Sequence, residues 1–281
     1  FDVDNNNSSN SLDITSHKVT HSPDANETQP VSKAVSGDNA DADADEIDTQ
    51  LTDLSANRTY SITVVNVNSV GMESAASVAT SQTTLPLAPT LTDSDTANTT
   101  TTINVDVTNN NENGSLAITK NVLSYTPSGG STSTADKNSS GAADAANVDT
   151  QITSLAANTE YSITATNVGV GGTSAASGAR TEYTLPAAPT FSVASKTTTS
   201  ITLTIDHNNA NGTSNIGKYD INVGGTSQFQ IGLNLAADKS DGSYTISGLT
   251  TGTTYAIKVA IENVGAGGFS AYSGVSNVTT D

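Results

Sequence analysis

The segment Leu249-Thr250-Thr251-Gly252-Thr253-Thr254-Tyr255-Ala256-Ile257-Lys258 has two counterparts earlier in the chain. They read Leu54-Ser55-Ala56-Asn57-Arg58-Thr59-Tyr60-Ser61-Ile62-Thr63 and Leu155-Ala156-Ala157-Asn158-Thr159-Glu160-Tyr161-Ser162-Ile163-Thr164. In each copy a Leu stands six residues before a Tyr, and an Asn-Val pair and a glycine-bearing turn follow the Tyr. Self-similarity at a fixed interval is the signature of repeat architectures. The sequence therefore predicts that one structural unit recurs along the 281 residues.

A second repeated segment sets the length of the unit. Thr84-Leu85-Pro86-Leu87-Ala88-Pro89-Thr90 returns 100 residues later as Thr184-Leu185-Pro186-Ala187-Ala188-Pro189-Thr190. We expect three domains, at residues 1–84, 85–184 and 185–281. The prolines restrict the backbone and favour extended conformations, so the linkers are expected to hold neighbouring domains end to end with limited bending.

Hydrophobic residues within each copy alternate with polar or small ones, as at Ile103, Val105 and Val107. A period of two is typical of half-buried antiparallel strands, and Asn-Gly and Asp-Gly pairs supply residues for tight turns. No window predicts an amphipathic helix, so the fold class is all-β. Phe1-Asp2-Val3 matches Val105-Asp106-Val107, which predicts a partial first domain that lacks its first strand.

The repeated segments resemble fibronectin type III domains. The match is fullest from Tyr244 to Ser273, and the Leu and Tyr of each copy resemble the tyrosine corner of that family. The resemblance implies tandem seven-stranded antiparallel β-sandwiches of immunoglobulin-like type, the first one incomplete. It also implies that Tyr60, Tyr161 and Tyr255 each bond back to the backbone of the preceding turn. The chain has no Trp, and Val3, Val105 and Leu203 or their neighbours stand where the family usually has one.

Composition narrows the partners. Ten Lys and Arg against 28 Asp and Glu give a net charge of -18, which should repel the phosphate backbone of nucleic acids. No apolar stretch approaches the roughly 20 residues of a membrane span, so membrane insertion is not expected. The absence of Cys excludes disulfides and thiolate metal sites.

Catalytic motifs are missing, and the sequence predicts that the protein is not an enzyme and has no catalytic residues or organic cofactor. There is no Gly-x-Ser-x-Gly, no phosphate-binding glycine loop and no His-Glu-x-x-His. His17 and His21 stand four apart in an expected strand, where they could form a two-imidazole metal site. The aligned residues of the second copy are Asn121 and Tyr125, so an ordinary strand surface is the favoured interpretation. His207 precedes an Asn-rich turn and is expected to be exposed.

The densest acidic run lies at residues 38–48. Oxygen ligands at alternate positions suit Ca²⁺, which makes Asp41, Asp43, Asp45 and Asp48 the candidate calcium ligands. The spacing of an EF-hand is absent, and the other two copies keep few acidic residues here. A solvated loop is the favoured interpretation, with calcium binding as the alternative.

The Asn-rich loops after the second strand and the Asn-Val turns after the sixth should lie at the same end of each sandwich, facing the preceding domain. Their amides are expected to hydrogen-bond the linker backbone. A ligand-binding role for these loops is the alternative, which their lack of aromatic residues disfavours.

These observations predict a structural and interaction protein, a rod-like segment of an extracellular or cell-surface filament, stalk or adhesin. The alternatives are a virion fibre or decoration protein and a spacer in a secreted polysaccharide-degrading enzyme. The expected partners are neighbouring copies of the chain, one of which could pair a strand beside Val3. Glycans are further candidate partners. The Asn-x-Ser/Thr sequons, as frequent as the composition predicts by chance, are Asn6, Asn7, Asn26, Asn57, Asn98, Asn113, Asn138, Asn211 and Asn277.

Overall fold

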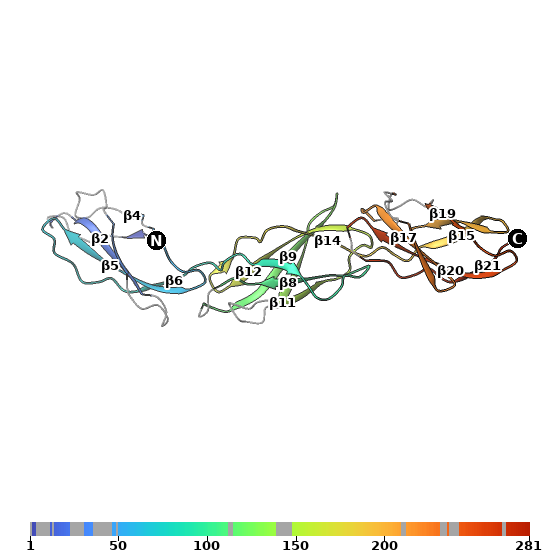
Figure 1. The fold of residues 1–281 in the computed structure, drawn as a ribbon. Coiled ribbons are helices and arrows are strands. Elements are labelled where there is room, and N and C mark those ends of the chain that lie inside the picture. Colours follow the sequence, from blue (N-terminus) through green and yellow to red (C-terminus); the bar gives the residue numbers. More distant parts are fainter. Residues whose placement is uncertain are drawn as a thin grey trace.

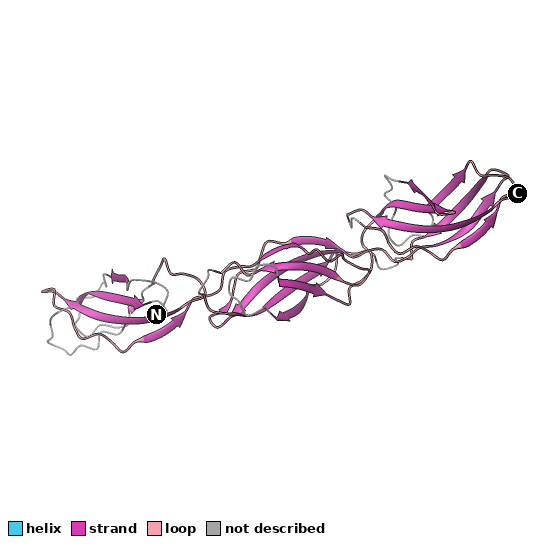
Figure 2. Ribbon diagram, turned by 60° about the horizontal axis from the view of Figure 1, so that its bottom comes forward, coloured by secondary structure: helices cyan, strands magenta, loops and turns pink. Residues whose placement is uncertain are grey.

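In a computed structural model of the chain, every described secondary-structure element is a β-strand (Figure 2). The part of the chain that the structure describes contains no helix long and apolar enough to cross a membrane. The described residues are 2–3, 12, 14–22, 31–35, 47–48, 50–111, 115–138, 148–208, 212–230, 235, 242–265 and 268–281.

The strands form three units that follow one another in a row (Figure 1). In the third unit, one sheet has the order β15-β16-β19 and the other the order β18-β17-β20-β21, all antiparallel. The bounds are β15 (Thr190–Lys196), β16 (Ser200–Asp206), β17 (Ile216–Val223), β18 (Thr226–Gln230), β19 (Gly242–Ser247), β20 (Thr254–Asn263) and β21 (Ser276–Thr279).

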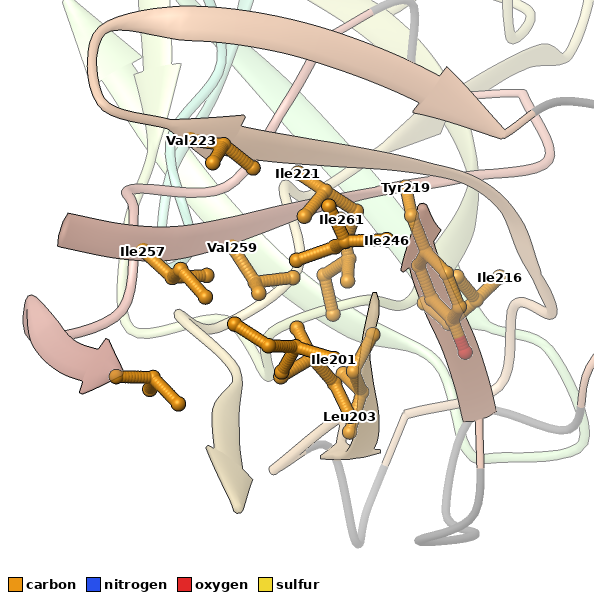
Figure 3. Close-up of a cluster of buried hydrophobic side chains, with 12 residues drawn as sticks. Ile201, Leu203, Ile216, Tyr219, Ile221, Val223, Ile246, Ile257, Val259 and Ile261 are labelled. Atoms are coloured by element: carbon orange, nitrogen blue, oxygen red, sulfur yellow. The ribbon is translucent and has the colours of Figure 1, made fainter. Parts of the chain in front are cut away.

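The two sheets of the third unit enclose a core of aliphatic side chains. Alternate residues of β16 and β20, among them Leu203 and Val259, are fully buried because a period of two sends them to the inner face. Figure 3 shows these residues with Tyr219 and Ile246 filling the space between the sheets. Leu203 lies at the position predicted to replace the missing Trp, and burial of its side chain contributes about 2 kcal/mol.

The second unit repeats this arrangement. Its sheets have the orders β11-β8-β7 and β10-β9-β12-β13, and β14 also pairs with β12. The bounds are β7 (Thr90–Asp93), β8 (Ile103–Thr108), β9 (Ile118–Pro127), β10 (Ser133–Asn138), β11 (Val148–Ile152), β12 (Glu160–Gly169), β13 (Gly172–Thr173) and β14 (Arg180–Tyr183). Ile103, Val105 and Val107 are fully buried, as the alternation predicted.

The first unit has a four-stranded sheet, β3-β2-β5-β6, and a two-stranded sheet, β1-β4. The bounds are β1 (Asp2–Val3), β2 (Ile14–Ser22), β3 (Val31–Val35), β4 (Ile47–Asp48), β5 (Thr59–Asn68) and β6 (Thr80–Thr83). Among the described residues, β1 pairs with β4 alone, whereas the equivalent strands β8 and β16 each pair with a preceding strand as well. The predicted all-β class of tandem antiparallel sandwiches is confirmed.

Two serines per unit, Ser174 and Ser177 in the second, bind the irregular segment before the last strand. The hydroxyl of Ser174 accepts a hydrogen bond from the Asn167 nitrogen (2.9 Å) and donates one to the Ala175 oxygen (2.7 Å). Ser74 and Ser270 make the same pair of bonds in the other units. Side-chain hydroxyls thus satisfy backbone groups that the short last strands leave without a ladder partner.

Candidate functional site: the domain junctions

Each repeated tyrosine fixes the turn before it. The Tyr60 hydroxyl accepts a hydrogen bond from the Ser55 nitrogen (2.9 Å), and the Tyr161 hydroxyl accepts one from the Ala156 nitrogen (3.0 Å). In the third copy the Thr250 nitrogen donates to the Tyr255 hydroxyl (2.8 Å). These bonds are those expected of a tyrosine corner.

The residue at the centre of this turn has a left-handed backbone conformation in all three units. It is Asn57 (φ 54°), Asn158 (φ 52°) or Gly252 (φ 60°). Asn and Gly are the residues that adopt this conformation at low cost. The turn therefore needs one of the two residues for its backbone, and the side chain of an Asn remains available for another contact.

Asn57 uses its side chain to bind the second unit. Its Nδ2 donates to the Leu116 oxygen, and the Leu116 nitrogen donates to the Asn57 oxygen (2.9 Å). The Asn57 nitrogen also donates to the linker oxygen of Leu85 (2.9 Å). Asn57 is fully buried, so the first domain, the linker and the second domain meet at this residue.

Asn158 makes the same set of bonds one domain later. Its Nδ2 donates to the Ser214 oxygen (2.7 Å), its oxygen accepts from the Ser214 nitrogen (3.1 Å), and its nitrogen donates to the Leu185 oxygen (3.0 Å). Asn158 is also fully buried, and Oδ1 has no partner at either Asn57 or Asn158. Two independent junctions with one hydrogen-bond pattern indicate a common docking geometry. We call Asn57 and Asn158 the clamp asparagines.

Glycines let the backbones approach at these contacts. A Cβ on Gly169 would lie 3.0 Å from the Asn57 Oδ1, and a Cβ on Gly212 would lie 2.8 Å from the Asn158 Nδ2. A Cβ on Gly171 would lie 2.4 Å from the backbone oxygen of Thr84, a distance that real side chains do not tolerate. Any larger residue at Gly171 would push the two domains apart.

Amides from the receiving domain bind the linker, as the sequence predicted. The Asn167 Nδ2 donates to the Leu87 oxygen (2.9 Å), and the Asn110 Nδ2 donates to the Ala88 oxygen (3.0 Å). At the next linker, Asn208 donates to the Ala188 oxygen (2.9 Å) and Asn263 to the Thr184 oxygen (3.2 Å). The linker carbonyls, which have no strand partner there, are thereby satisfied.

Buried polar residues lie beneath the receiving end of the second and third domains, by which we mean the end that contacts the preceding linker. In the second domain, the Asn121 Nδ2 donates to the Oδ1 atoms of Asn109 (2.9 Å) and Asn167 (2.7 Å), and all three residues are fully buried. In the third domain, His207 Nε2 and the Tyr219 hydroxyl are 2.6 Å apart. Burial raises the pKa of Tyr219 far above its usual value.

The structure corrects the expectations for the histidines. His207 is 1% exposed rather than a surface residue, because its imidazole lies against Tyr219 in the core. His17 and His21 are also buried and do not lie on a strand surface. His17 Nδ1 is 3.0 Å from the Asn66 Oδ1, and the ring of His21 packs edge-on against Tyr60. Among the residues the structure describes, no group of three or more His, Asp or Glu could hold a metal ion.

The candidate calcium ligands cannot be placed. Asp41, Asp43 and Asp45 lie outside the described residues, and Asp48 ends β4 with no description of its side chain. Among the sequons, Asn57 is buried in a junction, and its amide nitrogen is bonded to Leu116. Asn98 is likewise engaged, since its Nδ2 donates to Glu182 (3.1 Å) and to the Tyr183 oxygen (3.2 Å).

A hollow of about 310 Å³ lies at the outer end of the first domain. Its lining includes Leu12, Ile14, Asn66 and Met72. Ile14 is equivalent to Ile118, because Ile14 pairs with Asn68 at the end of β5 and Ile118 pairs with Gly169 at the end of β12. The hollow therefore occupies the position at which the second domain receives the linker.

A family model matches one of these domains. Residues 186–278 match the fibronectin type III domain. The third domain is a fibronectin type III domain. The resemblance to tandem fibronectin type III domains is confirmed. The second unit repeats the strand order of the third, the first unit repeats its four-stranded sheet, and both have its tyrosine corner. Domains of this family are structural and adhesion modules that are commonly extracellular or surface-exposed.

The comparison with solved structures found matches that contain fibronectin type III domains. The crystal structure of chicken CNTN1 FN1-FN3 domains is 14% identical, with a TM-score of 0.33, and the match covers 95% of this chain and 90% of that one. A two fibronectin type-III domain segment from chicken tenascin is 17% identical, with a TM-score of 0.37, and the match covers 69% of this chain and 99% of that one. The comparison with curated proteins found no match.

Proposed function

We propose that the chain is a stiff, rod-like structural segment of an extracellular or cell-surface assembly, which sets the distance and orientation between what lies at its two ends. The observation that carries the proposal is the repeated burial of a clamp asparagine at both junctions, each bonded to the domain ahead. A flexible string of domains would need no such bonds.

The energetics favour stiffness. Each clamp asparagine joins the two domains through side-chain and backbone hydrogen bonds, and a net hydrogen bond contributes about 1 kcal/mol. The buried prolines of the linkers, Pro86, Pro89, Pro186 and Pro189, reduce the freedom of the connecting backbone. Bending a junction would break several of these bonds together and expose the buried amide of the asparagine.

The proposed role is non-catalytic, in agreement with the sequence analysis. The buried amides of Asn121 and Asn167 hydrogen-bond to Asn109 and to the linker carbonyl of Leu87, so they hold the junction together. The predicted association with neighbouring copies of the chain stays a prediction, which sedimentation velocity over a range of protein concentrations would test.

Small-angle X-ray scattering of residues 1–281 tests the proposed function. A strand of 8 to 10 residues spans about 30 Å, so three domains in a row should give a maximum dimension on the order of 100 Å. The expected pair-distance distribution is that of a rod, with one peak at the domain cross-section and a linear decay. A distribution that requires an ensemble of bent conformers would contradict the proposal.

A further inference from the structure

The far end of the third domain repeats the turn of the other two domains but changes the residues that make the junctions. The hydroxyl of Thr280 donates to the Thr250 oxygen (2.6 Å) and accepts from the Thr253 nitrogen (3.1 Å). Thr84 and Thr184 make the same bonds to the turns that contain the clamp asparagines. The three domain ends are therefore equivalent in these two hydrogen bonds.

This equivalence identifies the substituted positions. Gly252 occupies the place of Asn57 and Asn158, and Asp281 occupies the place of Leu85 and Leu185. Gly252 keeps the positive φ that the turn requires, but it has no amide to donate to a following domain. The backbone conformation of the turn is thus kept, while the side-chain bond to the next domain is lost.

Asp281 adds a second difference. At the first junction, the Leu85 Cδ2 lies 2.9 Å from the position that a Cβ on Gly172 would take. At the second junction, the Leu185 Cδ2 lies 3.1 Å from the corresponding position on Gly268. Each leucine therefore packs directly on a glycine of the next domain. The Asp281 carboxylate instead lies 2.9 Å from Lys196 Nζ of its own domain. A charged group held back by its own domain cannot supply the apolar contact of a linker leucine.

We propose that the clamp asparagine with its linker leucine specifies a stiff junction, and that the third domain, which has Gly252 and Asp281 instead, forms a hinge with any domain placed after it. This inference rests on the proposed function, because it assigns the stiffness of the two inner junctions to particular residues. It predicts a junction after the third domain that is more flexible than the two junctions between the three domains.

The test adds a fourth domain whose receiving end is known to fit. Residues 86–184 are fused after Asp281, so that Asp281 precedes the proline of the natural linker and the new domain presents its own Leu116 and Gly172. The chain has no Cys, so two introduced cysteines can carry unique spin labels. Gly178 and Gly274 are equivalent, exposed and clear of neighbours, and their φ angles are not positive.

Double electron–electron resonance then measures two junctions. Labels at Gly178→Cys and Gly274→Cys report the inner junction, and labels at Gly274→Cys and at the second copy of Gly178→Cys report the new one. The new junction should give a distance distribution at least twice as broad as the inner one. In the variant that combines Gly252→Asn with Asp281→Leu, the new distribution should narrow to the inner width.

The outcomes separate the two claims. A narrow distribution at the unmodified new junction would overturn the hinge, and a double variant that stays broad would overturn the assignment to these two residues. A broad distribution at the inner junction would instead overturn the proposed function. Circular dichroism of each variant checks that all domains are folded. The single variant Gly252→Asn, which retains Asp281, shows how much of the narrowing comes from the amide and how much from the leucine contact.

Discussion

The side-chain nitrogen of Asn158 lies 2.7 Å from the main-chain oxygen of Ser214, a residue of the next domain. The bond connects a left-handed turn to the segment that enters a strand of the next domain, so this amide helps to fix the orientation of two sandwiches. The same relationship joins Asn57 to Leu116.

Asn158→Gly should loosen the second junction and leave the first unchanged. Glycine keeps the positive φ of the turn, so the substitution removes the side-chain bond without adding backbone strain. Loss of that bond is expected to cost about 1 kcal/mol of coupling between the domains. Electron–electron resonance between Gly178→Cys and Gly274→Cys should show a broader distribution. The matched variant Asn57→Gly should leave this pair unaffected, and an unchanged width in Asn158→Gly would contradict the assigned role.

Tyr161→Phe should destabilise the second domain. The substitution removes the acceptor of the Ala156 nitrogen, and an unpaired buried donor costs about 1 to 3 kcal/mol. Tyr161 is buried, whereas Tyr255 is more exposed, so water can replace the lost bond at Tyr255. Urea unfolding monitored domain by domain should therefore show a larger loss for Tyr161→Phe than for Tyr255→Phe. Equal losses would contradict this account of the tyrosine corner.

The third domain should lose stability in alkali. Burial raises the pKa of Tyr219, so the folded domain keeps this proton while an unfolded tyrosine releases it near pH 10. Below pH 10 both states are protonated and the effect is absent. Above about pH 10 the folded state binds more protons, and the free energy of unfolding should fall by about 1.4 kcal/mol per pH unit. Urea unfolding at pH 8 to 11.5 measures this slope, which Tyr219→Phe should reduce; an identical slope in the variant would count against the assignment.

Calcium should leave the thermal stability of the first domain unchanged if the acidic run at residues 38–48 is a solvated loop, as we propose. Thermal unfolding with calcium and with a chelator should then give the same midpoint for this domain. A midpoint that rises with calcium, and that no longer rises in Asp43→Asn with Asp45→Asn, would establish the alternative that these aspartates bind the ion.

Much of the architecture could be predicted from local pattern. The alternation at Ile103, Val105 and Val107 predicted strands whose inner residues are buried, and the Asn-rich loops predicted the bonds from Asn110 and Asn167 to the linker. These features depend on periodicity and on short-range turn chemistry, both of which are present in the sequence.

The clamp asparagines were missed. An Asn or Gly three residues after the repeated Leu is a signal for a left-handed turn, but it does not say whether the side chain reaches another domain. That contact depends on how two sandwiches dock, which no periodicity encodes. The prediction for His207 was wrong for a similar reason, because its place in the core depends on the approach of Tyr219 from another strand.

The most direct test of the account is the distance between spin labels at Val78→Cys and Gly178→Cys, equivalent exposed positions of the first two domains. A stiff junction predicts a single narrow distance peak that broadens in Asn57→Gly. A broad or multiple-peaked distribution in the unsubstituted junction, with no further change in Asn57→Gly, would contradict it.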